Sequence, residues 1–246
     1  MLKFGKQVFK LDAVDSTNNF AAKLINQGLA DNGAVVMAEF QSDGKGQRGN
    51  KWTAAKGMNL TASFVFFPDN MALNQIIAIN WWVSLCIVKA IAKYGLTVKI
   101  KWPNDIYADN VKLGGILIET SNTGSNVKSV VIGVGLNVNQ TDFGDLNATS
   151  IKQKIGNDTS IEDLCWTLCD MFSNNYSMLS NPLALRELYV HHLFRLSVES
   201  TFIFQGEKQK GMITGIDMSG RLIVAFKHGI EALEHGQITW VLPTQI

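Results

Sequence analysis

The sequence predicts a protein of mixed helices and strands that ends in a small all-β unit. Up to about residue 196, apolar runs typical of buried strands alternate with helical patterns. In the last fifty or so residues, four or five short strands are separated by glycine turns, which fits a small barrel or sandwich. A chain of 246 residues forms one large domain or two unequal ones. We therefore expect a main domain over 1–196 and a smaller one over 197–246.

The composition is that of an ordinary globular protein. The chain is 46% hydrophobic and 17% charged, and its formal net charge of +1 excludes a global field that recruits nucleic acid or membrane. Its three cysteines are an odd and sparse set, which indicates a reducing compartment. Cys165 and Cys169 lie one helical turn apart, and buried core thiols are favoured over a metal pair.

No targeting or membrane segment is expected. The first ten residues are too short and too polar for a signal peptide. The most apolar stretch, 73–94, is interrupted by asparagines and lysines, so it predicts a buried helix rather than a membrane span. These features predict a cytoplasmic protein.

In the first hundred residues the patterns predict strands over 4–11, 34–39 and 59–67 and helices over 18–28 and 73–94. Asp15, Ser16, Thr17 and Asn18 stand at the start of the first helix. A helix cap needs one such side chain, and here four follow one another. A cap and a polar ligand site are equally supported by this stretch alone.

Three later strands carry glycines and polar groups at one end. The strand at 98–101 is followed by Pro103, Asn104 and Asp105, and is either an edge strand with solvated lysines or part of a site. The strand at 112–119 begins with Lys112 and two glycines, and the one at 127–138 contains Gly133 and Gly135. Strand ends gathered on one side of a sheet form a natural floor for a ligand. The segment 160–194 reads as helical, and the tail strands are expected at 201–206, 210–217, 220–226 and 236–242.

The stretch Gly44-Lys-Gly-Gln-Arg-Gly-Asn-Lys-Trp52 combines three glycines, three cations and a tryptophan. It suits an ordered loop that folds over an anion and offers one aromatic face. Its Gly-x-Gly-x-x-Gly spacing matches a dinucleotide fingerprint, but that fingerprint requires an apolar helix to begin inside it. The following residues are polar and stop at Gly57, so we reject the match.

The recurring chemistry is that of polyanion binding. No Ser/His/Asp or Cys/His nucleophile is indicated, and the four histidines lie in the last quarter of the chain, away from the glycine-rich strand ends, so we assign them no role. Cations and amide donors instead recur near glycines, as phosphoryl or adenylyl chemistry requires. These residues are Lys45, Arg48, Lys101, Lys112, Gln41, Asn104 and Asn137.

Five motifs in order give the sequence a family resemblance. They are Asp15-Ser-Thr-Asn18, Gln41 with the 44–52 loop, Lys101-Trp-Pro-Asn-Asp105, Lys112-Leu-Gly-Gly-Ile116 and Gly133-Val-Gly-Leu-Asn137. Together they resemble a biotin protein ligase of the monofunctional form. The resemblance implies an α+β domain on a mixed sheet, the class II synthetase-like biotin/lipoate ligase fold, followed by an SH3-like C-terminal β-barrel.

The resemblance also implies a two-step, ATP-dependent reaction. The biotin carboxylate attacks the α-phosphate of MgATP, which gives biotinyl-5′-AMP and pyrophosphate, and a lysine of a biotin carboxyl carrier domain then takes the biotin. ATP and Mg²⁺ are thus expected as co-substrate and metal, with the metal ligands left open. A monomer or homodimer is expected, with no DNA or membrane partner. The Asp-Ser-Thr-Asn motif begins at residue 15, so no N-terminal DNA-binding domain is expected.

By motif position, the resemblance divides the candidate residues into two groups. Those expected to bind biotin are Ser16, Thr17, Asn18, Gln41, Lys45, Gly46, Gln47, Lys112, Gly115 and Gly133. Those expected to bind ATP are Arg48, Asn50, Trp52, Lys101, Asn104 and Asn137. Lys112, Lys45 and Arg48 are expected to be catalytic, with Lys112 contacting first the biotin carboxylate and then the acyl phosphate.

The loop departs from the arginine-rich family pattern, because Lys45, Gln47 and Asn50 replace three arginines. We expect weaker retention of the adenylate, since the latter two have lost the charge. Two alternatives stay open beside the main interpretation: a lipoate or octanoate ligase of the same superfamily, and a non-catalytic module that binds biotin or a nucleotide.

Overall fold

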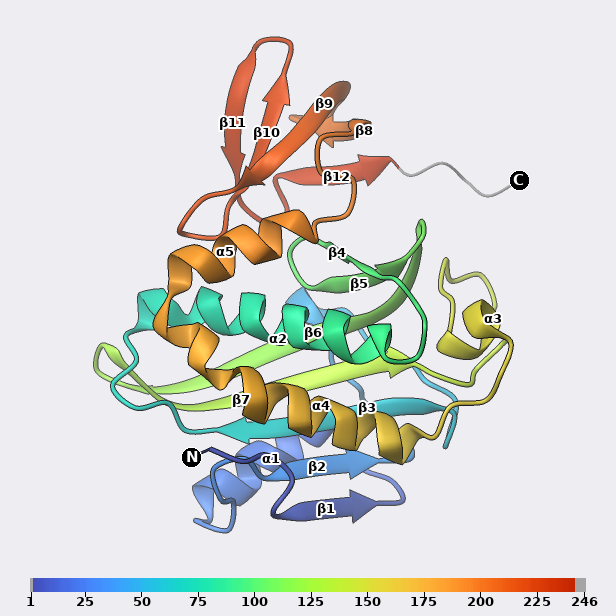
Figure 1. Ribbon diagram of the computed structural model, residues 1–246, viewed down its shortest axis with the longest axis vertical. Coiled ribbons are helices and arrows are strands. Elements are labelled where there is room, and N and C mark those ends of the chain that lie inside the picture. Colours follow the sequence, from blue (N-terminus) through green and yellow to red (C-terminus); the bar gives the residue numbers. More distant parts are fainter. Residues whose placement is uncertain (1, 242–246) are drawn as a thin grey trace.

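The protein contains two β-sheets, one in the main domain and one near the C-terminus (Figure 1). The computed structural model describes residues 2–241. The last residue of the strand predicted at 236–242, Leu242, lies outside the described part. Residue 1 of the expected domain 1–196 and residues 242–246 of the expected domain 197–246 also lie outside it.

The main sheet is mixed and has seven strands in the order β1-β2-β3-β7-β6-β5-β4. β1 and β2 run parallel and are joined by a helix, whereas every other neighbouring pair is antiparallel. The strands are β1 (Val8–Leu11), β2 (Val35–Ala38), β3 (Asn59–Phe66), β4 (Lys99–Lys101), β5 (Asp105–Ala108), β6 (Val111–Thr123) and β7 (Asn126–Asn137). This arrangement confirms the predicted α+β class.

Helices cover both faces of this sheet. α1 (Thr17–Asn26) packs on one face with Val36, Val65 and Val131. α2 (Ile76–Ala92) and α4 (Ile161–Asn175) pack on the other face, where Val35 and Phe64 join the larger core (Figure 1). Successive strand residues, such as Val35 and Val36, thus point to opposite faces of the sheet and pack in different hydrophobic clusters, as the pleat requires. The remaining helical segments are η1 (Gln47–Gly49), η2 (Leu73–Gln75), α3 (Ile151–Ile155), η3 (Tyr176–Ser180) and α5 (Pro182–His191).

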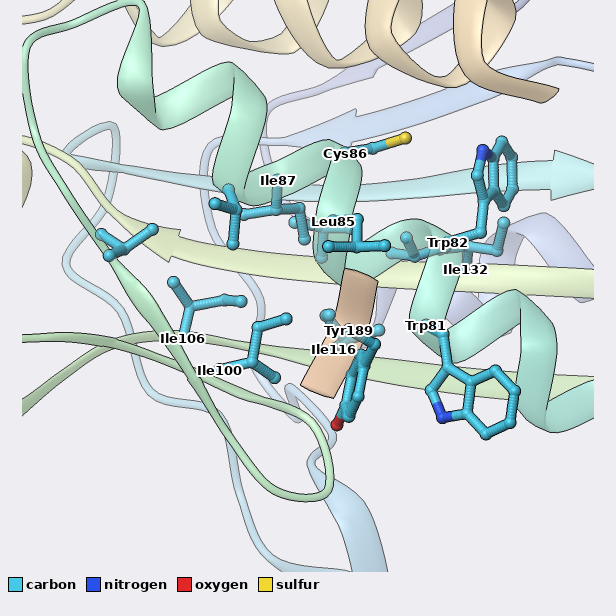
Figure 2. Packing of buried hydrophobic residues seen from close by; sticks show 14 of the residues in the cluster. Trp81, Trp82, Leu85, Cys86, Ile87, Ile100, Ile106, Ile116, Ile132 and Tyr189 are labelled. Carbon is cyan, nitrogen blue, oxygen red and sulfur yellow. The ribbon is translucent and has the colours of Figure 1, made fainter. Parts of the chain in front are cut away.

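α2 is the central core helix. The segment Leu73–Ala92 is long and apolar enough to cross a membrane by length and composition, but 67% of it is buried inside the protein. Figure 2 shows Trp81, Trp82 and Cys86 of this helix among the buried side chains of the core. Its burial confirms the predicted core helix. The predicted core thiols are also confirmed, because Cys86, Cys165 and Cys169 are all buried and free.

The C-terminal sheet has five antiparallel strands in the order β11-β10-β9-β8-β12. They are β8 (Glu199–Phe204), β9 (Glu207–Ile216), β10 (Leu222–Phe226), β11 (Gly229–Leu233) and β12 (Ile238–Val241). Within residues 2–241 the pairings describe an open sheet, with β11 and β12 at its edges. A closed barrel is therefore not among the observed features.

The C-terminal sheet is docked firmly on the main domain. The indole Nε1 of Trp102 donates to the carbonyl oxygen of Gly220 at 2.8 Å, and Ile100 forms a β-bridge with Leu193. A single hydrophobic cluster contains residues from both sheets. The boundary between residues 196 and 197 consequently stays a prediction. This docking brings β12 to the edge of the main sheet that carries β4.

Candidate active site

The principal cavity lies between the main sheet, the 44–52 loop and β12. Its volume is about 450 Å³. It is lined by the start of α1, by the loop, by the glycine-rich parts of β6 and β7, by the turn between β4 and β5, and by the segment that enters β12. Residues from almost the whole length of the chain therefore meet in one place.

One end of the cavity is uncharged and rich in hydrogen-bonding groups. The side-chain oxygen of Gln41 accepts from the backbone N–H of Thr17 at 2.8 Å and from its hydroxyl at 3.0 Å. Ser63, fully buried on β3, lies 2.8 Å from the Thr17 hydroxyl and 2.6 Å from Asn18 Oδ1. Ser16 is the N-cap residue of α1, but its side chain makes no cap hydrogen bond. The polar stretch therefore lines the cavity and does not cap the helix through the Ser16 side chain.

Two glycines of β7 let side chains approach the floor of the cavity. A Cβ at Gly133 would meet Asn18 Oδ1 at 2.5 Å, and a Cβ at Gly135 would meet the Trp52 ring at 2.5 Å. Both distances are below any tolerable contact, so only glycine fits at these positions. The strand backbone thus lines the cavity at both glycines, and its contact with a ligand stays a prediction.

Lys112 and Asp105 form an ion pair at the other end of the cavity. Lys112 Nζ lies 2.6 Å from Asp105 Oδ1. Both side chains are partly accessible, so a carboxylate or phosphate of a ligand can reach the ammonium. Asp105 is the single carboxylate among the described residues that line the cavity. The surrounding cations therefore exceed the acids, which favours an anionic ligand.

Lys101 carries its charge beside two aromatic rings. Its Nζ lies 5.1 Å from the ring centre of Tyr107 and 5.9 Å from that of Trp240. Burial lowers the pKa of Lys101 below its ordinary 10.5; the negative charge of Asp105 opposes this shift and the positive charge of Lys112 adds to it. Of the two alternatives for this edge strand, Lys99 follows the solvated one, whereas Lys101 lines the cavity.

The 44–52 loop is a short hairpin that closes over the uncharged end. Trp52 N donates to Gly44 O at 2.8 Å and Gly46 N donates to Asn50 O at 2.7 Å. No helix continues from the glycines, only the three-residue turn Gln47–Gly49, which supports the rejection of the dinucleotide fingerprint. Lys45 Nζ donates to Asn19 Oδ1 at 2.5 Å, so the hairpin is tied to α1.

The segment that holds most of the cavity matches a known protein family. The Biotin/lipoate A/B protein ligase family matches residues 11–137, which hold every residue of the cavity except those from the C-terminal sheet. The chain belongs to this family.

Curated relatives of this ligase-family chain match it over most of its length. The biotin–[acetyl-CoA-carboxylase] ligase of Paracoccus denitrificans is 28% identical over 93% of this chain and 98% of its own. The bifunctional ligase/repressor BirA of Bacillus spizizenii is 28% identical over 95% of this chain and 74% of its own.

The solved structures show that the fold is shared. The biotin protein ligase from Aquifex aeolicus in complex with biotin and ATP superposes with a TM-score of 0.78, at 22% identity over 96% of this chain and 98% of that one. The ligase from Leishmania major in complex with biotinyl-5-AMP superposes with a TM-score of 0.63, at 21% identity over 94% of this chain and 99% of that one.

The ligase-family site contains most of the residues that the sequence singled out. All predicted site residues line the cavity except Arg48 and Asn137. Asn137 is buried and donates to the carbonyl oxygen of Thr149 at 3.0 Å. Arg48 has a positive φ of 55° and its guanidinium lies against Gly236 of the C-terminal sheet. Neither residue is among those that line the cavity, although Gly236, against which the Arg48 guanidinium lies, is one of them.

His235 and Trp240 were missed by sequence reasoning. Contrary to the expectation that all histidines lie away from the glycine-rich strand ends, His235 lines the cavity and its ring stands edge-on to that of Trp102, with centres 5.8 Å apart. Burial, Arg48 and Lys101 lower the pKa of His235, and Asp105 opposes them. No sequence signal places β12 against the main sheet, since the contact joins segments more than a hundred residues apart.

Proposed function

We propose that this chain is an ATP-dependent biotin protein ligase. The observation that carries the proposal is the polarity of this cavity: an end of hydroxyls and amides faces an end where cations outnumber acids. A molecule with a neutral polar ring and a carboxylate tail fits the first end and points its charge at the second. Biotin has this shape, and the names of several curated relatives contain this activity.

In the first step, the biotin carboxylate attacks the α-phosphate of ATP and pyrophosphate leaves. Lys112 binds the carboxylate in exchange for Asp105, and Lys101 faces the phosphates. Bringing two anions together is the main electrostatic obstacle, and these ammonium groups reduce it. ATP enters as its Mg²⁺ complex, for which Asp105 is a fitting carboxylate, since Mg²⁺ bound to substrate phosphates needs only one or two protein carboxylates.

In the second step, an amine attacks the carbonyl carbon of the mixed anhydride and AMP leaves. The hairpin 44–52 covers the anhydride and excludes water, which would otherwise hydrolyse it. The proposed acceptor is a lysine of a biotin carboxyl carrier domain. The C-terminal sheet is proposed to be SH3-like. The proposed location is the cytoplasm, which agrees with three cysteines that are buried and form no disulfide.

The experiment is pyrophosphate release with ATP and Mg²⁺ in the presence of biotin, lipoate or neither. We expect release that depends on biotin, followed by biotin incorporation into a carrier domain with an intact acceptor lysine and none into the same domain with that lysine changed to arginine. Lipoate-dependent release would support the lipoate ligase instead, and no release with either acid would leave a non-catalytic binding module.

A further inference from the structure

Asn18 is held from both sides, and two of the side chains that hold it, Glu119 and Ser63, do not line the cavity. Its Nδ2 donates to Glu119 Oε2 at 2.7 Å and lies 3.5 Å from the carbonyl oxygen of Leu117. Its Oδ1 lies 2.6 Å from the hydroxyl of Ser63. Asn18 itself is buried and lines the cavity, whereas Glu119 is exposed on β6 and Ser63 is buried on β3. One side chain of the site is thus oriented by two neighbouring elements.

This pairing selects one of the two orientations of the amide. The terminal torsion of asparagine is broad and roughly two-fold, so oxygen and nitrogen can exchange places at small cost. In the exchanged orientation Oδ1 would face the carboxylate of Glu119 and the carbonyl of Leu117, which are both acceptors. Glu119 therefore disfavours the exchange by electrostatic repulsion and favours the observed orientation by a charge-assisted hydrogen bond.

The selected orientation decides what Asn18 offers to a ligand. An amide oxygen has two acceptor sites, and the Ser63 hydroxyl, which must donate to it, uses one. The amide lies close to Gly133, where a Cβ would be 2.5 Å from Oδ1. The second acceptor site is thus held at the uncharged end of the cavity, where a ligand N–H can reach it.

We propose that Glu119, together with Ser63, is a positioning residue for biotin recognition. It acts through Asn18, which it holds with the amide oxygen ready to accept an N–H of the cyclic urea of biotin. The inference rests on the proposed function and adds to it a residue outside the cavity. Ser63 Oγ also lies 2.8 Å from the hydroxyl of Thr17, whose single proton goes either to Ser63 or to Gln41 Oε1.

The test is the dissociation constant of biotin, measured by titration calorimetry on the full chain without ATP. Glu119→Ala removes the acceptor and is expected to weaken biotin binding about tenfold, the effect of losing a hydrogen bond to a charged group. Glu119→Gln keeps an acceptor oxygen and is expected to stay within about twofold of the wild type. The KM for ATP and the melting temperature should not change in either variant. Glu162→Ala, which removes an exposed glutamate paired with Lys10, is the control.

The same titration in an Asn18→Ala background shows whether Glu119 acts through Asn18. There, Glu119→Ala should cause no further loss, because the side chain that it orients is absent. A tenfold loss that persists in this background would overturn the proposal, as would wild-type affinity in Glu119→Ala or an equal loss in Glu119→Gln.

Failure of the inference is distinguishable from failure of the proposed function. If the wild type neither binds biotin nor releases pyrophosphate with it, both are overturned. If the wild type does both and the Glu119 variants bind biotin equally well, the ligase function stands and the inference is wrong.

Discussion

At the scale of single residues, the reactive end of the cavity is set by ion pairing and burial. Lys112 is held 2.6 Å from Asp105, so its ammonium is fixed in place before a ligand arrives. Lys101 lies between aromatic rings of both sheets, and burial lowers its pKa. Lys112 is thus an ion-paired ammonium, whereas Lys101 is a partly buried ammonium with a lowered pKa.

Replacing Lys112 by alanine should reduce the rate of biotin-dependent pyrophosphate release by roughly 10²–10³-fold, the usual effect of removing a group that stabilises charge in the transition state. Lys154→Ala is the matched control, because Lys154 makes an ion pair of similar length, 2.8 Å, with Asp109 outside the cavity. The measurement is single-turnover formation of the adenylate. A Lys112→Ala rate within tenfold of the wild type would remove this residue from the chemistry.

The lowered pKa of Lys101 predicts a pH dependence of ATP use. The ammonium is present below its folded-state pKa and is lost as pH rises through that value, which lies below the ordinary 10.5. The kcat/KM for ATP should therefore fall on the alkaline side. Lys101→Arg should move this fall to higher pH, because a guanidinium stays protonated. Identical profiles of wild type and variant between pH 7 and about 10.5, in a range where melting curves show the fold intact, would contradict the prediction.

At the scale of elements, the 44–52 hairpin carries Lys45, Gln47 and Asn50 where the family resemblance leads us to expect arginines. Its own hydrogen bonds close it, and Lys45 ties it to α1. Gln47 and Asn50 line the cavity without charge, while Arg48 lies against Gly236. The hairpin therefore covers the site with fewer cations directed at a ligand than its composition suggests.

Restoring a cation at this hairpin should slow adenylate release. In Gln47→Arg, a guanidinium at the cavity wall can bind the phosphate, and the release rate of biotinyl-AMP is expected to fall about tenfold, as one added charge-assisted hydrogen bond predicts. Gln27→Arg, at an exposed residue outside the cavity lining, controls for net charge. The measurement is rapid dilution of preformed complex. Equal release rates in wild type and Gln47→Arg would refute the idea.

The close approach of Trp52 to β7 predicts the effect of a single methyl group. Gly135→Ala places a Cβ within 2.5 Å of the indole, so the ring and the end of the hairpin must move. We expect ATP binding to weaken about tenfold, with roughly 1–3 kcal/mol of overpacking at the contact. In a Trp52→Ala background the same change should have little effect. A full effect of Gly135→Ala in that background would show that the contact with Trp52 is not responsible.

At the scale of the whole molecule, the C-terminal sheet completes the site. His235 and Trp240 line the cavity beside Lys101 and Trp102, and the Trp102 indole is anchored on Gly220 of the same sheet. The two sheets share one hydrophobic cluster, so their relative position is held by packing. The end of the cavity near Lys101 therefore depends on residues that lie outside the family-matched segment 11–137.

Trp240→Leu tests this dependence. Leucine retains apolar packing against Phe194 and Phe202 but removes the ring that faces Lys101. The KM for ATP is expected to rise about three- to tenfold, in keeping with a partly desolvated cation–π contact, while the biotin dissociation constant stays unchanged. Trp166→Leu, on the outer surface of α4, is the control for loss of a tryptophan. A matching rise in the biotin dissociation constant would mean general damage to the cavity.

Much of the fold was predictable because its signals are local. The strands that become β2, β3, β6 and β7 and the core helix α2 were visible as apolar runs of the right length. β5 and α3 were missed, since four or five residues are too few to show a period and Asp105 follows a turn-forming proline. Thr61, which lines the cavity, and Ser63, which contacts Asn18 from behind, were also missed, because small polar groups in an apolar strand carry no signal of their own.

The sequence by itself determined which chemistry the protein holds: glycines for close approach, amides and hydroxyls for a neutral ring, and lysines for anions, in five motifs of the family order. Only the tertiary structure decided which of these groups meet. It left Arg48 and Asn137 out of the cavity lining, brought in His235 and Trp240, and placed Glu119 next to Asn18. The physical reason is that residue type is a local property of the chain, whereas side-chain direction depends on packing partners distant in sequence, such as Trp102 and Gly220.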